Sequence, residues 1–454
     1  MAGVTGPPHN TRMTGLPLGP ETMTAESAAE WLRDARQRTL ALADDLTDQQ
    51  LEVPLLPILN PPLWELGHVG WFQERWLLRH YGGRPPLRAD GDALFDSSAV
   101  AHDSRWRLPL LSRAATLAYL ESVLDRVLAT LPTGVLPPDQ AYFCWLAVMH
   151  EDMHGEAFTY TRQTLGYAPP RTAAAATADG RPLTGDAVIP GGEFRLGAEP
   201  AERAFVFDNE QWAHSVRIAP FAIARAAVTN GEFAAFVGDG GYRRRELWSA
   251  EGWTWREGAG AEHPVYWAPE PSGGGPGWRR REFDRWVALG EDLPVIHVNA
   301  FEAEAYCAWA GRRLPSEAEW EMAAAGGPGQ AEKRRWPWGD ALPSDGGVPA
   351  RWEGRALGCA PVSAYPEGDS AWGCRQMMGN VWEWTASAFR PYPGFSAGPY
   401  LDYSQPWFTP EHRVLRGGCW ATRARLLRNT WRNFYPAHRR DVFASFRTCA
   451  MPLS

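Results

Sequence analysis

The stretch Met149-His-Glu-Asp-Met-His-Gly-Glu156 carries two histidines four residues apart and follows a strongly apolar run. This spacing places both imidazoles on one face of a helix, one turn apart. A third histidine lies upstream in another apolar stretch, Pro61-Pro-Leu-Trp-Glu-Leu-Gly-His-Val-Gly-Trp-Phe72. Three imidazoles from neighbouring helices form a facial site with open positions, which suits iron, zinc or copper. We therefore predict that His68, His150 and His154 bind a divalent metal inside a helical domain.

Two other interpretations of this stretch have to be weighed. A histidine pair at this spacing often occurs by chance on an exposed helix face. The apolar run at 141–149 instead predicts burial, and buried imidazoles need hydrogen-bond or metal partners. The segment also satisfies the zinc-protease pattern H-E-x-x-H, with Glu151 as the general base. No third ligand follows at a protease-like spacing, so zinc hydrolysis is the weaker interpretation. Glu156 lies on a different helical face from the histidine pair, and we interpret it as a supporting residue rather than a ligand.

Apolar residues recur at helical spacing over several segments of the first third of the chain. The predicted helices cover residues 27–46, 61–81, 111–131 and 140–165, with a loop at 82–108. Helices that surround one metal site in this way form a bundle.

The character of the sequence changes after residue 168. Residues 169–185 are rich in Ala, Pro and Thr, have no apolar periodicity, and are predicted to be a linker. Beyond them, short β-like stretches at 187–196 and 214–221 alternate with Gly/Pro turns. Only two helices are predicted there, at 230–237 and at 299–325, and the second should break at Gly311-Arg-Arg-Leu-Pro315.

The whole chain therefore divides into successive parts, and the predicted fold class is α+β. Residues 1–22 are rich in Gly, Pro and Thr and lack the apolar core of a signal peptide, which predicts a flexible leader of a cytoplasmic protein. A helical bundle with the metal site follows at 23–168, then the linker at 169–185, and then an irregular α+β domain at 186–454.

Composition narrows the classes of function. The net charge of −8 argues against binding to nucleic acid or to an anionic membrane surface. No run approaches the roughly 18 apolar residues that a membrane span needs, so we expect no membrane partner. The six cysteines form no C-x-x-C pair, which argues against a zinc ribbon or a disulfide framework. The 24 tryptophans predict an aromatic core, and their faces can also line a pocket for a cationic ligand.

The second half resembles the formylglycine-generating-enzyme-like, or sulfatase-modifying-factor, domain, which is a variant of the C-type lectin fold. The resemblance rests on Gly311-Arg-Arg-Leu-Pro-Ser-Glu-Ala-Glu-Trp320, Met378-Gly-Asn-Val-Trp-Glu-Trp384 and Leu415-Arg-Gly-Gly418, among other motifs in the same order. Oxidation of a cysteine to formylglycine is not expected here. Those oxidases hold copper with two closely spaced C-terminal cysteines, whereas Cys419 and Cys449 are far apart in this sequence.

The first half resembles the DinB-like helical bundle, with its His…His-x-x-x-His-x-Glu signature. The two domains in this order resemble the ergothioneine-type sulfoxide synthases, non-haem iron enzymes that act on hercynine, the betaine of histidine. The resemblance implies that His68, His150 and His154 hold Fe(II). It also implies that O2 and a thiol or selenol donor meet hercynine there, and that sulfur or selenium is joined to imidazole C2. The oligomeric state is left open.

The same resemblance assigns substrate binding to the C-terminal loop 428–440. Asn433 and Phe434 are the first candidates for binding the betaine, followed by Trp431 and Tyr435, because a trimethylammonium group favours aromatic faces. The alternative for each of these residues is simple packing of the loop.

Three arginines near the C-terminus are candidates for binding a substrate carboxylate by bidentate pairing. They are Arg439, Arg440 and Arg447. Pairing with Asp441 or Asp402 is the alternative.

Some members of the family place a catalytic tyrosine near the iron as a proton donor. The Gly/Pro-rich segment 390–403 is where this resemblance locates it. Tyr400 is the first candidate, and Tyr392 and Tyr403 follow.

Two departures from the family bear on the substrates. Met153 stands where some members carry a glutamine that contacts hercynine. Tyr435 stands where members that use γ-glutamylcysteine carry an acidic residue suited to the ammonium group of the donor. This loss favours free cysteine or a selenosugar, as in the selenoneine synthases of the family, which the stretches 60–68 and 92–98 also resemble. The alternatives from other classes are a zinc-dependent DinB-like thiol transferase or hydrolase, and an adaptor without metal.

Overall fold

The computed structural model describes residues 22–171, 183–200, 204–271, 277–329, 332–341, 350–354 and 356–452. The predicted leader, apart from Thr22, and most of the predicted linker lie outside the described residues. The observed architecture, a helical bundle followed by a domain of small sheets and helices, confirms the α+β class.

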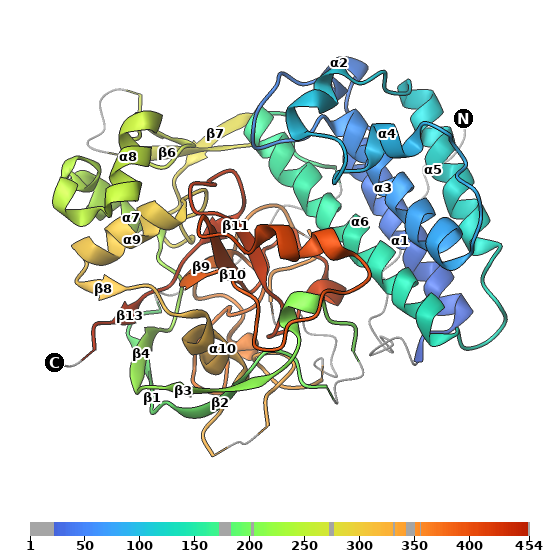
Figure 1. Cartoon of the computed structure of the whole chain (residues 1–454). Coiled ribbons are helices and arrows are strands. Elements are labelled where there is room, and N and C mark those ends of the chain that lie inside the picture. Colours follow the sequence, from blue (N-terminus) through green and yellow to red (C-terminus); the bar gives the residue numbers. More distant parts are fainter. Residues whose placement is uncertain are drawn as a thin grey trace, which may run out of the picture.

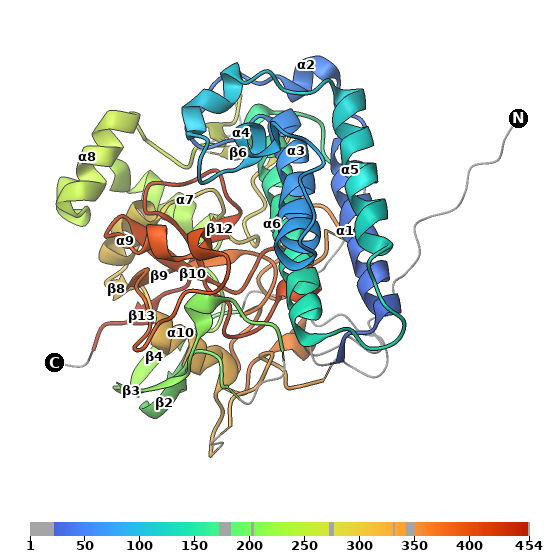
Figure 2. The ribbon, with the colours of Figure 1, turned by 45° about the vertical axis from the view of Figure 1, so that its right-hand side comes forward.

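The first part of the chain is a bundle whose helices lie side by side (Figure 2). Its long helices are α1 (Ala25–Ala43), α3 (Pro62–Gln73), α5 (Arg113–Leu128) and α6 (Pro138–Leu165). The α1 helix begins at a capping box in which Thr24 and Ser27 satisfy each other's backbone amides. The α6 helix begins with a proline in its first turn and ends at Gly166, whose φ of 67° closes the last turn in the left-handed region. No helix within the described ranges is long and apolar enough to cross a membrane.

Two local features of the bundle differ from the prediction. The helix predicted at 61–81 continues past α3 as a π-helical segment, η2 (Glu74–Tyr81). The loop predicted at 82–108 contains α4 (Gly91–Phe95) and the 3-10 segment η3 (His102–Arg107), and a further short helix, α2 (Asp48–Leu51), precedes α3. These segments are too short to show helical periodicity, so sequence patterning misses them.

The second domain contains small sheets rather than one large sheet. One sheet has the order β1-β4-β13-β8 and another the order β11-β10-β9-β12, while β2-β3 and β5-β6-β7 form smaller antiparallel sheets. The strands are β1 (Asp186–Ile189), β2 (Gly192–Leu196), β3 (His214–Ile218), β4 (Phe221–Ala224), β5 (Trp267–Pro269), β6 (Trp278–Glu282), β7 (Arg285–Ala288), β8 (Arg312–Arg313), β9 (Trp382–Ala388), β10 (His412–Arg416), β11 (Asn433–Pro436), β12 (Ala444–Ser445) and β13 (Cys449–Ala450).

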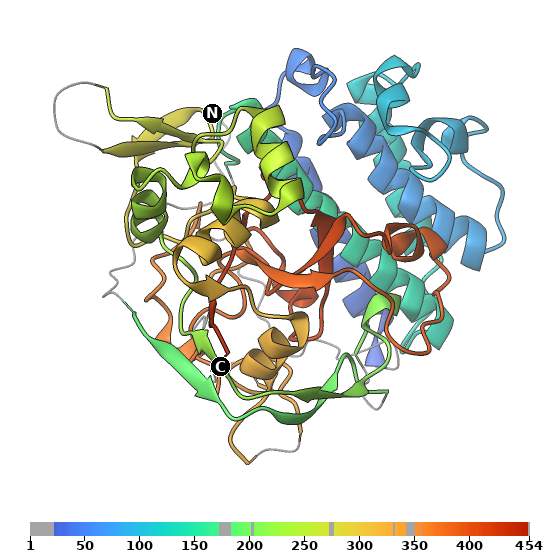
Figure 3. The same ribbon diagram turned by 60° about the vertical axis from the view of Figure 1, so that its left-hand side comes forward.

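The helices of the second domain are α7 (Asn230–Gly238), α8 (Ala250–Ala259), α9 (Ala300–Trp309) and α10 (Glu317–Ala325). Three of them, α7, α8 and α9, lie on its side away from the bundle in Figure 1, the side that comes forward in Figure 3, while α10 lies near β9 and β10. The predicted break between 311 and 315 is confirmed, because α9 ends before it and α10 starts after it. The prediction of only two helices was wrong, since α8 was missed: Gly252 is its only buried residue, so the helix has no apolar stripe.

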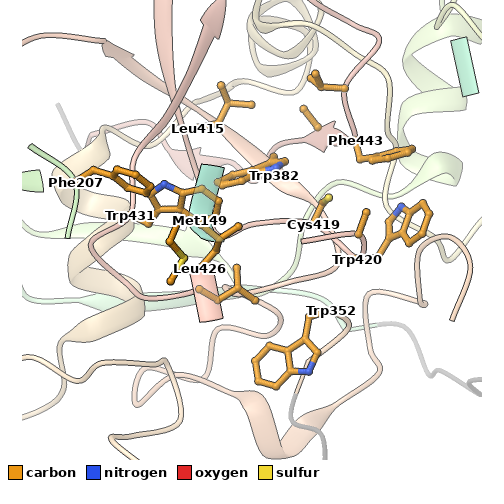
Figure 4. Close-up of a cluster of buried hydrophobic side chains, with 14 of the residues drawn as sticks. Met149, Phe207, Trp352, Trp382, Leu415, Cys419, Trp420, Leu426, Trp431 and Phe443 are labelled. Carbon is orange, nitrogen blue, oxygen red and sulfur yellow. The ribbon is translucent and has the colours of Figure 1, made fainter. Parts of the chain in front are cut away.

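The two parts of the protein share a hydrophobic core through α6. In Figure 1 this helix runs between the bundle and the strands β9, β10 and β11. Met149 of α6 lies among Leu426, Trp431 and Trp382 of the second domain (Figure 4). The helix with the histidine pair is therefore an element of both domains.

Candidate active site

The three predicted metal ligands come together between α3 and α6. His68 lies on α3, while His150 and His154 lie on consecutive turns of α6. One ring nitrogen from each of the three lies within 4.8 Å of the others. The Nε2 atoms of His68 and His150 are 3.2 Å apart. The arrangement is a compact facial group of imidazoles.

Hydrogen bonds orient two of these rings. Nδ1 of His68 donates to the carbonyl oxygen of Phe95 at 2.8 Å, and Nδ1 of His154 donates to Glu65 Oε1 at 2.5 Å. These bonds leave Nε2 of each ring unprotonated and available to a metal. Sequence reasoning did not single out Glu65; its signal was a carboxylate in an otherwise apolar helix, one turn before His68.

Burial keeps two of the ligand rings, those of His68 and His150, neutral. Desolvation, reinforced by the neighbouring histidines, lowers the pKa of His68 and of His150 well below the ordinary value. Nδ1 of His150 is buried and has no hydrogen-bond partner among the described residues. Three imidazoles with convergent nitrogens, two of them buried and neutral, fit a borderline divalent cation such as Fe(II) or Zn(II).

Aromatic rings enclose the histidines. Trp64 stacks on His68 with ring centroids 4.8 Å apart, and Phe72 stacks on His150 at 3.5 Å with nearly parallel planes. Tyr400 of the second domain meets the Phe72 ring at 5.1 Å and the His150 ring at 6.5 Å. Burial raises the pKa of Tyr400 to about 12, so its hydroxyl stays protonated and able to donate near neutral pH.

A cavity of about 170 Å³ opens beside Tyr400 and Phe72. Aromatic rings form one part of its wall and polar side chains the other. The cavity is lined by Trp71, Phe72, Arg75, Trp76, Asp96, Ser97, Ser98, Pro399, Tyr400, Leu401 and Asp402. It joins the bundle to the loop of the second domain that carries Tyr400, and Ser98 donates a hydrogen bond to Asp402 across it at 2.7 Å.

The candidates for binding the betaine lie on and before β11. Phe434 stacks on Phe389 at 4.0 Å and meets Tyr403 edge-on at 6.1 Å. The Tyr403 hydroxyl in turn contacts Met153 Sδ on α6 at 3.8 Å, so this aromatic group borders the helix that carries the histidine pair. Asn433 is half-buried on the same strand.

Trp431 and Tyr435 flank these residues in the chain. Trp431 is buried against Trp382, with ring centroids 4.8 Å apart, and belongs to the shared core. Tyr435 is half-buried, and the Arg439 guanidinium lies 5.1 Å from the centre of its ring.

Other candidates have partners away from the histidines. Tyr392 donates to Glu317 at 3.2 Å. Arg447 forms a buried bidentate pair with Glu383, at 2.6 and 2.7 Å.

The remaining arginines follow the same pattern. Arg439 pairs with Asp441 at 2.6 Å, which is the alternative weighed for it from the sequence. Arg440 lies over Trp255 at 5.2 Å and is 3.9 Å from Glu302.

The acidic residues of the histidine stretch support the helix. Glu151 pairs with Arg36 inside the bundle at 2.8 Å, so it is not free to act as the general base of a zinc protease. Glu156 accepts hydrogen bonds from Trp382 Nε1 at 2.7 Å and from Thr422 Oγ1 at 2.6 Å, both in the second domain.

Comparison with known proteins agrees with this architecture. Residues 31–157 match the DinB superfamily, and residues 172–451 match the sulfatase-modifying factor enzyme 1-like domain. Over 428 residues the chain is 42% identical to a hercynine oxygenase of Mycolicibacterium thermoresistibile, covering 92% of this chain and 93% of that protein. It is also 42% identical over 431 residues to a hercynine oxygenase of Mycobacterium tuberculosis, covering 93% and 98%. A formylglycine-generating enzyme of Streptomyces coelicolor is 38% identical over 285 residues, 56% of this chain and 85% of that enzyme.

A DinB-type bundle with converging histidines, joined to a sulfatase-modifying-factor domain, defines a two-domain enzyme of the oxidoreductase class. The chain belongs to the hercynine oxygenase family, which comprises the ergothioneine-type sulfoxide synthases.

Proposed function

We propose that this enzyme uses Fe(II) and O2 to join a chalcogen atom to C2 of the hercynine imidazole. The observation that carries the proposal is the convergence of His68, His150 and His154 within 4.8 Å at the junction of the two domains. The hercynine oxygenases that are 42% identical over nearly their whole length support hercynine as the substrate. Bound to the three imidazoles, Fe(II) would supply redox chemistry and open positions for the reactants.

The side chains around the histidines have separate tasks in this reaction. The Glu65 carboxylate orients the His154 ring through Nδ1, which leaves Nε2 as the nitrogen that would hold the metal. Tyr400 Oη, which keeps its proton near neutral pH, donates that proton during turnover. The aromatic faces of Phe434 and its neighbours hold the trimethylammonium group of hercynine, with Asn433 beside them.

For the donor we propose a selenosugar, with a cysteine-type thiol that yields a sulfoxide as the alternative. The cavity beside Tyr400 supports the sugar, because Asp96, Ser97 and Asp402 offer hydrogen-bonding groups to hydroxyls while Trp71 and Trp76 offer flat apolar faces. Tyr435 provides no negative charge for the ammonium group of a peptide donor.

The proposal is tested by anaerobic reconstitution with Fe(II), followed by exposure to O2 with hercynine and one donor at a time. The donors are a selenosugar, cysteine and γ-glutamylcysteine, and the products are read by mass spectrometry. We expect O2 uptake and a hercynine adduct with the selenosugar. An adduct with a thiol alone would assign the enzyme to carbon–sulfur chemistry.

Zinc-loaded enzyme is the control for the competing function. Zinc has no accessible redox change, so it should support no O2 uptake and no adduct. Thiol transfer by the zinc form, together with inactivity of the iron form towards hercynine, would replace our proposal with a zinc-dependent thiol transferase.

A further inference from the structure

One arginine of the second domain lies between two helices of the bundle. Arg425 forms a bidentate pair with Asp152 of α6, at 2.5 Å from Nε and 2.8 Å from Nη2. Its third nitrogen, Nη1, is 2.8 Å from Asp34 of α1. The guanidinium lies 5.3 Å from the centre of the Trp31 ring, also on α1. A single side chain from outside the bundle therefore joins α1 to α6.

This contact belongs to a network of ion pairs whose central pair, Arg425 and Asp152, is buried. Asp152 is 3% exposed and Arg425 is 8% exposed. Arg423 adds a bond to Asp34 and lies 3.7 Å from Glu353. Buried charges of this kind are tolerated only as pairs, and removal of one partner leaves the other uncompensated. The docking of the second domain onto the bundle therefore depends on Asp34 and Asp152.

Asp152 lies between the histidine pair in the sequence and on the opposite side of the helix. Two residues along a helix correspond to a rotation of roughly 200°. The turn that presents His150 and His154 to His68 is therefore held from behind by Arg425. One turn later, Glu156 is held from the same side by Trp382 and Thr422.

We propose that Arg425 is a positioning residue of the metal centre. His68 comes from α3 and the other histidines from α6, so the convergence of the three rings depends on the rotation and height of α6 in the bundle. Arg425 fixes the rotation and the height of α6, because it bonds to α6 on the face opposite the histidines and also to the neighbouring helix α1. Metal affinity then depends on the docked second domain. The inference rests on the proposed function only in that the histidines bind a metal.

The test is anaerobic titration of the full-length protein with Co(II), followed by visible absorption, which reports affinity and coordination geometry without any turnover. We expect Arg425→Met to bind Co(II) about tenfold or more weakly than the wild type, with an altered spectrum and unchanged far-UV circular dichroism. Arg425→Lys, which keeps the charge, should recover part of the affinity. Asp152→Asn breaks the same ion pair by removing the charge of the aspartate without changing the side-chain volume, and it should weaken Co(II) binding in the same way. This variant tests the proposal even if Arg425→Met does not fold.

Arg162 provides a matched control on the same helix. It is also buried and forms a bidentate pair, with Asp45 at 2.8 Å from both Nη atoms, but the pair lies inside the bundle and two turns beyond His154. We expect Arg162→Met to lower the Tm and to leave the Co(II) Kd within about twofold of the wild type.

Unchanged Co(II) affinity and spectrum in Arg425→Met and Asp152→Asn would overturn the positioning role. An equal loss of Co(II) affinity in Arg162→Met would also overturn the positioning role, because the loss would then come from a general destabilisation of the bundle. Wild-type protein that binds no Co(II) would overturn the metal site itself. Loss of Co(II) in the Arg425 variant, combined with no hercynine product from the wild type, would overturn the proposed reaction alone.

Discussion

Nδ1 of His154 donates a hydrogen bond of 2.5 Å to the carboxylate of Glu65, which is 1% exposed on the neighbouring helix α3. A carboxylate behind a metal-binding imidazole fixes its tautomer and raises its basicity. The pair also links α3 and α6 at the point where their histidines meet.

We predict that Glu65→Gln weakens metal binding by about ten- to a hundredfold. The amide keeps the shape of the carboxylate but loses its charge, so the imidazole becomes a poorer ligand. Isothermal titration with Fe(II) under anaerobic conditions measures the change. Glu74→Gln is the control, since Glu74 is equally buried and accepts a hydrogen bond from Tyr119 at 2.6 Å without contacting a histidine. Equal affinity in the wild type and the Glu65 variant would remove this carboxylate from the metal site.

His154→Ala should abolish Fe(II) binding and turnover while the second domain remains folded. Two imidazoles cannot reproduce a facial group of three, and the His154 side chain is 18% exposed, so its loss should leave no large cavity in the core that the domains share. Metal analysis after gel filtration and near-UV circular dichroism of the tryptophans measure the two effects. Full activity of this variant would disprove the ligand assignment.

Tyr400→Phe should lower turnover by about 10² to 10⁴ and leave Fe(II) affinity unchanged, because it removes a proton donor but no ligand. Single-turnover O2 consumption with hercynine present separates this effect from substrate binding. Tyr403→Phe is the comparison, since Tyr403 contacts Met153 rather than the histidine rings. A loss confined to the Tyr403 variant would transfer the role to that residue.

Phe434→Ala should raise the KM for hercynine by about tenfold, the effect expected from losing one cation–π face. Iron content should stay at the wild-type level, because Phe434 stacks on Phe389 and not on a ligand. Histidine, which lacks the trimethylammonium group, is the matched substrate and should be affected much less. An unchanged hercynine KM would exclude Phe434 from the pocket.

His297 makes the stability of the protein depend on pH. Burial, with smaller contributions from Arg281 and Arg280, lowers the pKa of His297 to about 3. Its ordinary pKa is about 6.5, so between these values the unfolded chain binds more protons than the folded one. Above about pH 6.5 His297 is neutral in both the folded and the unfolded state, so it does not affect the free energy of unfolding. Below that pH the unfolded chain takes up a proton that the folded protein does not, which lowers the free energy of unfolding by up to about 1.4 kcal/mol per pH unit.

Urea unfolding at pH 7 and pH 5 measures this dependence. His297→Asn should reduce the loss of stability between the two values by about 2 kcal/mol. Asparagine suits the position because the residue has a φ of 62°. An identical loss in the variant would show that other groups carry the pH dependence.

Much of the fold could be predicted because its signals are local. The break between α9 and α10 follows from the residues of the segment 311–315 themselves. The α8 helix escaped prediction because its tryptophans, Trp253 and Trp255, are only half-buried and form no apolar stripe. The π-helical segment η2, which follows α3, could not be predicted either, since apolar periodicity does not distinguish it from an α-helix over so few residues.

The candidate site shows the same division. Tyr400, which was predicted from the sequence, lies beside His150, and Glu65, which the sequence did not single out, bonds to His154. The partners of Arg439 and Arg447 are carboxylates of the second domain, Asp441 and Glu383. Bidentate pairing was expected of these arginines, but a sequence cannot distinguish a partner in the protein from a substrate.

The sequence by itself determined that His150 and His154 share one helical face, because a spacing of four residues fixes their direction through backbone geometry alone. Only the tertiary structure decided that Glu65 supports His154 and that Arg425 lies between α1 and α6 behind the histidine pair. Glu65 and Arg425 are distant in the chain from their partners. Glu65 meets His154 through the packing of α3 against α6 within the bundle, whereas Arg425 meets Asp34 and Asp152 through the packing of the second domain against the bundle. No periodicity in the chain encodes that packing.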